Sequence, residues 1–379
     1  MIPLTMPSIE EDDLRAMREV LASGYLVQGA RVAAFEKTVA EYVGTRYAVA
    51  VSSGTAALHL GLLSLSIQPG DFVIVTAYSF IATANVIELC GAQPVFVDIQ
   101  PDTFNMDPDC LEKILSRVMA STETAHRVKA VLPVHTFGQM ADMPAILELA
   151  NRHGLPVIED AACALGATLN GRQAGTWGLM GCFSFHPRKA ITTGEGGVIT
   201  TNDLDLARQL RTLRNHGQEP GKETPDFILP GFNYRMTEFQ AVLGITQMAK
   251  LDRIITARRR LAAHYDALLA KTPFQPPTVF PGSQPVYQSY VTLLPENAAS
   301  RQADLIRQLK GQGIETTIGT WHLPLTTYYR RRYGYRTGDF PVTDQVFSRA
   351  LTLPLFEQLQ ETQQGVVVDQ LLQALQERT

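Results

Sequence analysis

The chain has 379 residues, of which 45% are hydrophobic and 18% are charged. This composition is typical of a folded globular protein and excludes a disordered chain. The formal net charge of −4 argues against a general nucleic-acid binder, because such proteins carry a dominant basic surface. At this length we expect one large domain with a smaller companion.

The cysteines and the amino terminus indicate the compartment. Cys90, Cys110, Cys163 and Cys182 form no C-x-x-C pair and have no histidines at zinc spacing, so we expect neither a disulfide framework nor a metal site. The start MIPLTMPSIEEDD lacks the basic and apolar parts of a signal peptide, and no stretch approaches 18 uninterrupted apolar residues. We expect a cytoplasmic protein that binds no membrane.

The first part of the chain alternates apolar runs with helical stretches. After a helix over 9–23, continuous Val, Ile and Leu runs predict strands that are buried on both faces. Strands separated by helices predict an α/β fold with a mostly parallel central sheet flanked by helices, in which ligands bind beyond the carboxyl ends of the strands. The expected strands are 47–51, 72–75, 94–99, 130–134, 156–158, 183–185 and 198–201.

The pattern changes near residue 241. A long amphipathic helix to about 270 is followed by PFQPPTVFPGSQP, whose prolines are typical of a linker. The strand YVTLLP, a helix near 301–312, the stretch GIETTIGTW and a last helix from about 359 predict a smaller α+β domain. We therefore divide the chain into residues 1–247 and 248–379. The arginine runs 258–260 and 330–332 are interpreted as solvated helix faces.

Two strand ends carry candidate ligand contacts. In S-S-G-T-A, Gly54 allows close approach of the backbone and Thr55 offers a hydroxyl and an amide, a combination that suits either a phosphate or an ordinary helix cap. In A-Y-S-F, Phe80 either stacks on a planar ligand or belongs to the core.

Two further strand ends carry charged side chains. Glu159 and Asp160 in V-I-E-D-A-A-C either cap and pair structurally or hold a ring nitrogen protonated, because a nearby anion favours the cation. Lys189 lies in F-S-F-H-P-R-K-A-I-T-T-G-E-G-G, which is no phosphate loop of the G-x-x-x-x-G-K-[ST] type. It is no dinucleotide fingerprint either, since Ile199 stands where the third glycine is needed.

These strand ends have one common explanation. A phosphate cup, a stacking ring, an acid for a pyridine nitrogen and a lysine amine are the contacts that pyridoxal phosphate requires. Lys189 would form the Schiff base with the cofactor aldehyde, and Asp160 would keep the ring nitrogen protonated.

The chain resembles the DegT/DnrJ-type sugar aminotransferases, a branch of the fold type I pyridoxal phosphate enzymes. The matching motifs follow one order over almost the whole chain. They are SSGTAALHLGL (52–62), QPGDFVIV (68–75), FIAT (80–83), GAQPVFVDI (91–99), PVHTFGQMADM (133–143), VIEDAACALGA (157–167), FSFHPRKAITTGEGG (183–197), LRNHG (213–217) and GFNYRMTEFQAVLG (231–244).

The resemblance implies that residues 1–247 form the large cofactor-binding domain. Lys189 and Asp160 are then catalytic: Lys189 carries the internal aldimine and moves a proton between the donor Cα and C4′ of the cofactor, and Asp160 pairs with the ring nitrogen. The remaining cofactor contacts expected within the subunit are Gly54, Thr55, Phe80, Cys163 and Ser184.

Four of the implied positions involve a partner, a substrate or a departure from the family. Asn233 is expected to reach the cofactor phosphate of a neighbouring subunit, which implies a homodimer with shared active sites. Arg235 is a candidate for the donor carboxylate, and His322 either faces the sugar or is an ordinary surface or interface histidine. Cys163 stands where relatives often carry Gln or His near the phenolic oxygen, and we interpret this weakly donating thiol as tuning or packing.

The resemblance also implies the reaction. We expect an aminotransferase that moves an amino group from an amino acid, L-glutamate by analogy, to the C4 keto group of a nucleotide-linked 4-keto-6-deoxyhexose by a ping-pong mechanism. Lys189 favours transamination over dehydration, because related sugar dehydratases carry histidine there. A 3-keto sugar or keto-cyclitol acceptor, a dehydratase and a non-catalytic regulatory protein are the alternatives. Arg188 is expected to point away from the cofactor.

Overall fold

The computed structural model describes residues 1–377, and two sheets that continue into each other form its centre. One sheet has the order β1-β10-β9-β6 and the other the order β4-β2-β5, and isolated parallel bridges from Val131 to Val157 and from Val134 to Asp160 connect them. The strands are β1 (Tyr47–Val51), β2 (Phe72–Thr76), β4 (Gln93–Val97), β5 (Val128–Leu132), β6 (Ile158–Asp160), β9 (Met180–Ser184) and β10 (Gly197–Thr201).

The sheet is mostly parallel, as predicted, and β10 is its reversed strand. β6 pairs parallel with β9, and β2 pairs parallel with β4 and β5. β10 runs antiparallel to both β1 and β9. Residues 185–196 return the chain through turns instead of a crossover helix, so the two strands that they join pair as in a hairpin. Lys189 lies in this connection.

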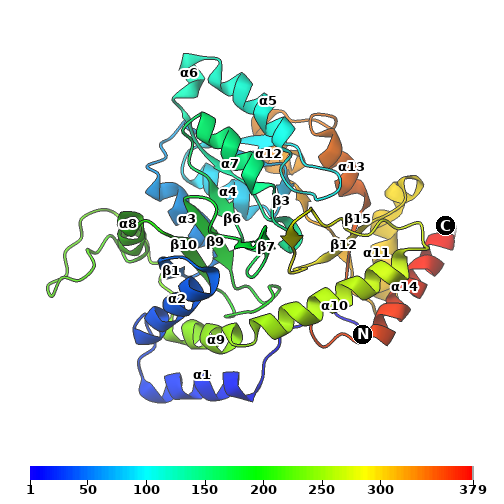
Figure 1. Ribbon diagram of the computed structural model, residues 1–379, viewed down its shortest axis with the longest axis horizontal. Coiled ribbons are helices and arrows are strands. Elements are labelled where there is room, and N and C mark those ends of the chain that lie inside the picture. The colour runs from blue at the N-terminus through cyan, green and yellow to red at the C-terminus, as the bar shows by residue number, and fades with distance from the viewer. Residues whose placement is uncertain (378–379) are drawn as a thin grey trace.

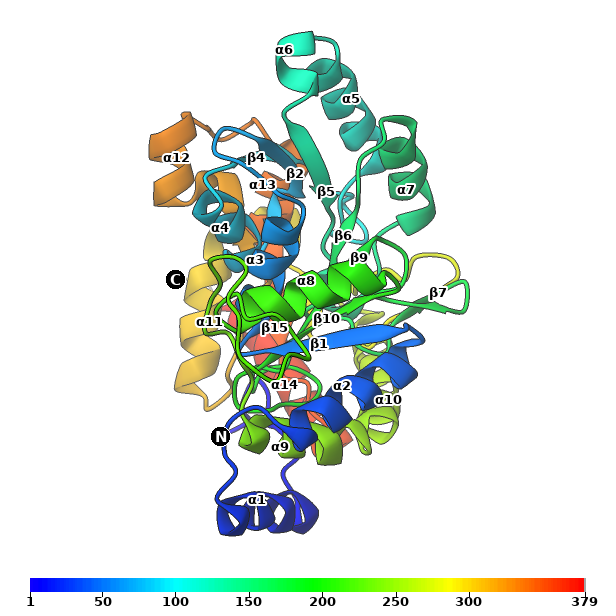
Figure 2. The same cartoon turned by 90° about the vertical axis from the view of Figure 1, so that its left-hand side faces the viewer.

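Helices cover both faces of the sheet (Figure 1). Several begin at a side-chain cap: carboxylate oxygens of Asp107, Asp142 and Asp203 and the hydroxyl of Thr237 accept backbone N–H groups of the first turn. α1 and α6 lie at opposite ends of the molecule in both views (Figures 1 and 2). The helices of this part are α1 (Glu11–Ser23), α2 (Ala30–Val43), α3 (Gly54–Ser64), α4 (Ala82–Leu89), α5 (Pro108–Met119), α6 (Thr122–Ala125), α7 (Met143–Arg152), α8 (Leu204–Arg214) and α9 (Glu238–Met248).

Alternate residues of one strand enter two separate cores. Ala48 and Ala50 of β1 belong to a core that includes apolar residues of α2, α5, α7 and α9. Val49 and Val51 belong to a second core with α3, α4 and α8. Successive side chains of a strand point to opposite faces, so both faces of β1 are buried. This arrangement confirms the prediction made from the continuous apolar runs.

The carboxyl-terminal part forms a smaller α+β unit. Its antiparallel sheet has the order β12-β15-β13 and packs with three of its helices in a third core. The elements are α10 (Leu251–Leu269), β12 (Tyr290–Leu293), α11 (Gln302–Gly311), β13 (Thr317–Ile318), α12 (Thr327–Tyr333), α13 (Pro341–Arg349), β15 (Ala350–Leu353) and α14 (Glu361–Gln376).

Packing crosses the predicted boundary at 247/248 in several places. The amino-terminal Ile2 forms a parallel bridge with Ile314 in the small unit. In the other direction, Tyr329 and Phe340 join the core of α3 and α4, and a short ribbon pairs β3 (Tyr78–Ser79) with β14 (Trp321–His322). The division itself stays a prediction. A second ribbon also crosses this boundary, since β11 (Ser283–Gln284) pairs with β7 (Thr168–Leu169), which in turn pairs with β8 (Arg172–Gln173).

The long helix expected over 241–270 is two helices, α9 and α10. The break falls at Ala249 and Lys250, where the Lys250 amine is buried and donates to Asp12 at 2.7 Å and to Asp13 at 2.6 Å in α1. The break lets α9 pack on α1 and α2 while α10 packs on α14.

One arginine of α10 is not solvated as expected. Arg258 is 2% exposed, and its Nη1 donates to the carbonyl oxygens of Tyr287 and Gln288 at 3.1 and 3.2 Å. Burial lowers the pKa of this guanidinium to about 10. The interpretation of 258–260 as a solvated face is therefore wrong for Arg258. Among residues 1–377, no helix is both long and apolar enough to cross a membrane.

Candidate active site

The candidate residues gather at one edge of the sheet. β1, β6 and β9 point the same way, and Asp160 and Ser184 are the last residues of β6 and β9. Across β10, Val51 lies opposite Gly197, and Gly197 lies opposite Ser184. The S-S-G-T loop after β1 therefore lies beside the end of β9, at the edge where ligands bind in such sheets.

The amino terminus of α3 forms a tight cup with Ser184. Ser53 Oγ accepts the amide of Ala56 at 3.1 Å, which confirms a helix cap and leaves the first amides, of Gly54 and Thr55, without intrahelical partners. A Cβ on Gly54 would lie 2.7 Å from Ser184 Cβ, so only glycine fits there. Thr55 is exposed. Free amides at a helix start suit a phosphate.

Asp160 is a buried carboxylate with two protein donors. It is 4% exposed; Thr83 Oγ1 donates to its Oδ2 at 2.7 Å, and the Ala162 amide donates to its Oδ1 at 3.2 Å. Burial raises the pKa of Asp160, and these two donors together with the Lys189 charge oppose that rise. A carboxylate has room for about four donors, so Asp160 can accept a further N–H.

Lys189 reaches the same place from the β9–β10 connection. Its amide donates to the His186 carbonyl at 2.8 Å, which closes a turn, and its Nζ lies 3.1 Å from Cys163 Sγ. The amine is also near enough to Asp160 for its charge to lower the pKa of that carboxyl, against the effect of burial. Arg188 is exposed, as a side chain pointing away from the site would be.

The residues present fit pyridoxal phosphate. The cup at α3 suits the phosphate, the spare acceptor capacity of Asp160 suits a protonated ring nitrogen, and the Lys189 amine has a thiol for a neighbour instead of a carboxylate. When bound, this cofactor supplies an electron sink for chemistry at the donor Cα. Lys189 is the residue that would hold its aldehyde.

Phe80 is 62% exposed and lies two residues before α4. Its interpretation as a core residue is therefore wrong. The ring is free to cover a planar group, and stacking on the cofactor stays a prediction. Three residues later, Thr83 turns back toward Asp160.

The segment with Asn233 and Arg235 runs along the end of β1. The Ser52 amide donates to the Tyr234 carbonyl at 2.9 Å, and Arg235 forms an antiparallel bridge with Val51. The Asn233 side chain is exposed, and Arg235 Nη1 donates to Asn215 Oδ1 at 2.8 Å. Their roles toward a neighbouring subunit and a donor carboxylate stay predictions.

His322 is 2% exposed, so the alternative of a surface histidine is wrong within this chain. Its Nε2 lies 3.0 Å from Asp344 Oδ1, and its ring meets Phe340 and Phe347 edge-on. Burial lowers the pKa of His322, and the nearby Asp344 carboxylate opposes that fall. A sugar contact for His322 stays a prediction. In this chain the imidazole pairs with Asp344 and packs against Phe340 and Phe347.

Sequence reasoning missed two groups beside the site. Thr83 and Ser79 form a hydroxyl chain to Asp160, with 2.8 Å between Ser79 Oγ and Thr83 Oγ1. His135 binds Glu159 through its Nε2 at 2.9 Å, and both side chains are fully buried. The one signal for Thr83 was its place in the FIAT motif, one helical turn after Phe80.

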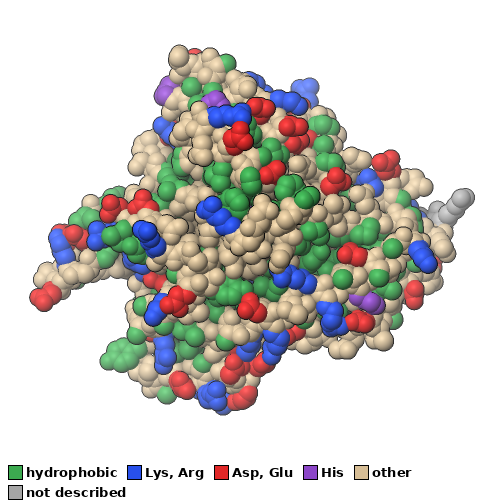
Figure 3. All heavy atoms as spheres, in the orientation of Figure 1, with side chains coloured by type: hydrophobic (Ala, Val, Ile, Leu, Met, Phe, Trp, Pro, Cys, Tyr) green, Lys and Arg blue, Asp and Glu red, His purple; other side chains and the backbone are tan. Residues whose placement is uncertain are grey.

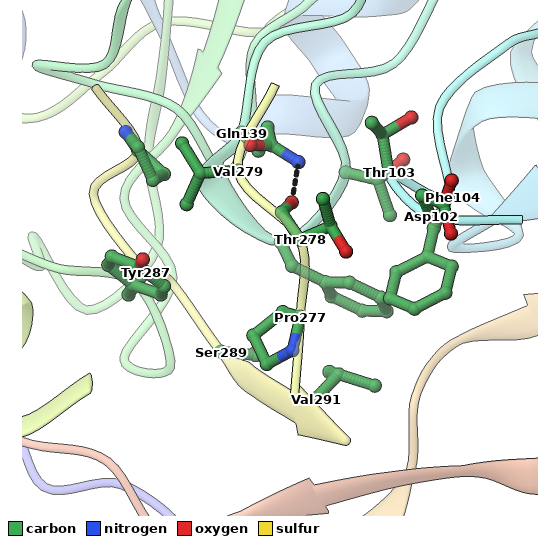
Figure 4. Close-up of a pocket in the computed structure, with 13 residues that line it drawn as sticks. Asp102, Thr103, Phe104, Gln139, Pro277, Thr278, Val279, Tyr287, Ser289 and Val291 are labelled. Atoms are coloured by element: carbon green, nitrogen blue, oxygen red, sulfur yellow. Dashed lines mark hydrogen bonds between the residues drawn. The ribbon is translucent and has the colours of Figure 1, made fainter. Parts of the chain in front are cut away.

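Figure 4 shows the lining of a cavity with a volume of about 30 Å³. It is bounded by Phe104, Phe137 and Tyr287, whose φ angles of 61°, 56° and 47° are left-handed, and beside it Gln139 donates to the Thr278 carbonyl at 2.9 Å. The cavity has room for about one water, and its lining contains none of the predicted site residues. It is not the cofactor site.

Comparison with known proteins defines the class of this site. A family model described as "DegT/DnrJ/EryC1/StrS aminotransferase family" matches residues 7–372. The solved structure of Spr1654 from Streptococcus pneumoniae, in its PLP form, superposes with a TM-score of 0.91 at 28% identity and covers 98% of both chains; a PMP form of that protein is also known.

Two curated relatives are similar over most of their length. GDP-perosamine synthase of Caulobacter vibrioides is 40% identical over 318 residues, 83% of each chain. The spore coat polysaccharide biosynthesis protein SpsC of Bacillus subtilis is 36% identical over 388 residues, 99% of this chain and 96% of its own. The chain belongs to the DegT/DnrJ/EryC1/StrS aminotransferase family. It is a fold type I aminotransferase that uses pyridoxal phosphate.

Proposed function

We propose that this enzyme transfers the amino group of L-glutamate to the C4 keto group of a nucleotide-linked 4-keto-6-deoxyhexose. The observation that carries the proposal is the Lys189 amine, 3.1 Å from Cys163 Sγ and close to the buried Asp160 at the sheet edge. The similarity to GDP-perosamine synthase supports a nucleotide-linked sugar as the acceptor.

The roles of the chain's own groups follow from this arrangement. When the cofactor is bound, Lys189 would hold its aldehyde in the resting enzyme and would move the proton at the reacting carbons once the donor is in place. Asp160 would accept from the ring nitrogen and stabilise its positive charge. The α3 amides and Ser184 would hold the phosphate and so fix the cofactor while the donor and the acceptor bind in turn. Such an alternation is a ping-pong mechanism.

The first experiment separates an aminotransferase from a non-catalytic protein. Enzyme loaded with pyridoxal phosphate should lose its visible absorption band when L-glutamate is added and regain it when a keto-sugar is added. Lys189→Ala should lose at least about 10³-fold in turnover, since the groups that act on the reacting proton are worth 10²–10⁴-fold. Full turnover by Lys189→Ala would refute the assignment.

The acceptor is tested with a panel of nucleotide-linked 3-keto and 4-keto sugars and keto-cyclitols. Product analysis by mass spectrometry and NMR should find nitrogen at C4 of a 6-deoxyhexose. Nitrogen at C3 or on a cyclitol would replace this acceptor with the alternative one. Loss of water without gain of nitrogen would identify a dehydratase.

We also propose a homodimer with shared active sites. Asn233 is exposed beside the S-S-G-T loop, and apolar side chains including Tyr25, Val27, Phe227 and Ile228 are exposed. Phe227 and Ile228 belong to the loop that follows α8 and leaves the body of the molecule (Figures 1 and 3). A partner subunit would cover such side chains.

Mixing two inactive variants tests the shared site. If Asn233 serves the neighbour's cofactor, a dimer of one Lys189→Ala chain and one Asn233→Ala chain has one intact site. Refolded equimolar mixtures should then recover about a quarter of wild-type activity, because half of the dimers are mixed and each has one good site. No recovery, or a monomer in analytical ultracentrifugation, would refute the arrangement.

We place the enzyme in the cytoplasm, since its four cysteines are free thiols.

A further inference from the structure

A chain of two hydroxyl groups leads to Asp160 from β3 and α4. Ser79 is the last residue of β3, and Thr83 lies in the first turn of α4. Ser79 Oγ lies 2.8 Å from Thr83 Oγ1, and Thr83 Oγ1 lies 2.7 Å from Asp160 Oδ2. All three side chains are buried, so water does not compete for these hydrogen bonds.

The direction of the chain depends on the charge of Asp160. A hydroxyl has one proton, so when Thr83 donates to an ionised Asp160, Ser79 must donate to Thr83. If Asp160 were protonated and donated instead, both hydroxyls would reverse. The Ser79 proton would then need another acceptor, and among residues 1–377 the hydrogen-bond partner of Ser79 Oγ is Thr83. The chain therefore favours the ionised carboxylate.

The other groups around Asp160 do not substitute for this hydrogen bond. Lys189 acts on it through charge, and the Ala162 amide holds the opposite oxygen, Oδ1. On the neighbouring strand β9, Cys182 is a thiol whose pKa is raised by burial. Thr83 is thus the side chain that fixes Oδ2, and it leaves the remaining acceptor positions for a ligand.

We propose that Thr83 is a positioning residue that keeps Asp160 ionised and aimed at the cofactor ring nitrogen, with Ser79 setting the direction of the Thr83 hydroxyl. This inference rests on the proposed role of Asp160. On this proposal the FIAT segment has two roles: it presents Phe80, and it supplies the Thr83 hydroxyl that positions Asp160. The hydroxyl chain also connects the site to the small unit, since Ser79 pairs with Trp321 across the β3–β14 ribbon.

The variants separate the hydroxyl from the volume of the side chain. Thr83→Val keeps the shape and removes the donor, whereas Thr83→Ser keeps the donor. We expect Thr83→Val to slow the glutamate half-reaction about tenfold or more, the size of one hydrogen bond to a charged group. The KM for glutamate should change much less, and Thr83→Ser should restore most of the rate. Ser79→Ala should give a smaller loss, of about threefold.

The pH dependence of the cofactor's absorption is the readout that a purely structural role would not move. Loaded Thr83→Val should give a titration midpoint of the visible band that differs from wild type, and Thr83→Ser should follow wild type. Equal losses in Thr83→Val and Thr83→Ser would overturn the proposal in favour of packing. A wild-type rate and titration for Thr83→Val would also overturn it. If Thr83→Val does not fold, Ser79→Ala serves instead, and an unchanged titration midpoint in that variant would overturn the proposal.

Asp160→Asn distinguishes failure of this inference from failure of the proposed function. If Asp160→Asn is impaired and Thr83→Val is not, the hydroxyl chain alone is refuted. If Asp160→Asn also keeps wild-type absorption and rate, the role of Asp160 itself is wrong.

Discussion

The two faces of strand β6 carry adjacent carboxylates in opposite situations. Glu159 accepts four hydrogen bonds, from the amides of Gly175, Trp177 and Gly178 at 2.7–2.8 Å and from His135 at 2.9 Å. Asp160, on the other face, accepts two. The first carboxylate is saturated by the fold, and the second keeps capacity for a ligand. Burial alone does not mark a catalytic acid; burial with unused acceptor capacity does.

The His135 tautomer shows that the hydrogen bonds of Glu159 are all supplied by the fold. Its Nδ1 accepts the Ala141 amide at 3.2 Å, so Nε2 carries the proton that is donated to Glu159. The imidazole and the carboxylate thus satisfy each other without a free position. We therefore assign Glu159 to the fold and Asp160 to the reaction, and the following changes test that division in order of expected size.

Replacing Asp160 should give the largest effect on catalysis. We expect Asp160→Ala to lower kcat/KM by about 10³-fold, since it removes the anion that supports a positively charged ring nitrogen in a dry site. The free energy of unfolding of the cofactor-free protein should change much less than the activity does. The substitution removes a carboxylate whose burial is itself unfavourable. Steady-state kinetics and urea titration measure the two quantities. A variant that is destabilised and still active would reverse the division.

Replacing Glu159 should give the opposite result. Glu159→Ala leaves three amides and the His135 N–H buried without an acceptor, which should reduce the free energy of unfolding by about 3–5 kcal/mol. Urea titration monitored by circular dichroism measures the loss. Double replacement of Glu159 by Ala and His135 by Leu should recover part of it. A stable Glu159→Ala enzyme with lost turnover would contradict the structural role.

Enlarging the cup tests the phosphate end of the site. Gly54→Ala places a Cβ 2.7 Å from Ser184 Cβ, and we expect it to weaken cofactor binding by about tenfold, the size of a 1–2 kcal/mol repacking. Equilibrium dialysis gives the dissociation constant. Gly365→Ala is the matched control, because a Cβ there meets nothing within 4 Å and alanine favours the α14 helix. Unchanged binding in Gly54→Ala would place the phosphate elsewhere.

The smallest effect is expected beside the lysine. Arg188 and Lys189 are another adjacent pair, and the Arg188 side chain is exposed while its carbonyl accepts the Gln288 amide. Arg188→Ala keeps that carbonyl, so kcat/KM should stay within about twofold and stability within about 0.5 kcal/mol. A loss of tenfold or more in glutamate turnover would mean that Arg188 binds substrate.

Much of the fold could be predicted from the sequence, because continuous apolar runs indicate strands that are buried on both faces. The exact strand ends were not predictable: β4 and β5 end two residues before the predicted ends and β6 two residues after, yet Lys189 and Asp160 still lie at the predicted edge of the sheet. The reversed direction of β10 was not predictable either, since strand direction depends on pairing between distant segments. The break at Lys250 was also hidden, because helical periodicity continues across it and only the acids of α1 reveal it.

Individual side chains were harder to predict than elements. Thr83 and Ser79 matter through a carboxylate that lies 77 residues after Thr83 in the chain. His322 and Arg258 are polar residues in ordinary helical or strand contexts, and their burial becomes visible only when Asp344 and the carbonyls of 287–288 are placed beside them. The burial of these side chains depends on partners that are distant in the chain, and a single sequence does not show which residues become partners.

The hydrogen bonds of residues 2 and 4 constrain the order in which the two parts of the chain assemble. The Ile2 amide donates to Gly313 at 2.7 Å, the Glu315 amide donates to Ile2 at 2.9 Å, and the Leu355 amide donates to Leu4 at 3.0 Å. Residues 2 and 4 can therefore find these partners only after residues 313–355 have been synthesised. The large sheet can form from segments that are made earlier, whereas the small unit closes only when residue 355 is available. A substitution at Ile2 should therefore slow the closing of the small unit and leave the formation of the large sheet unchanged.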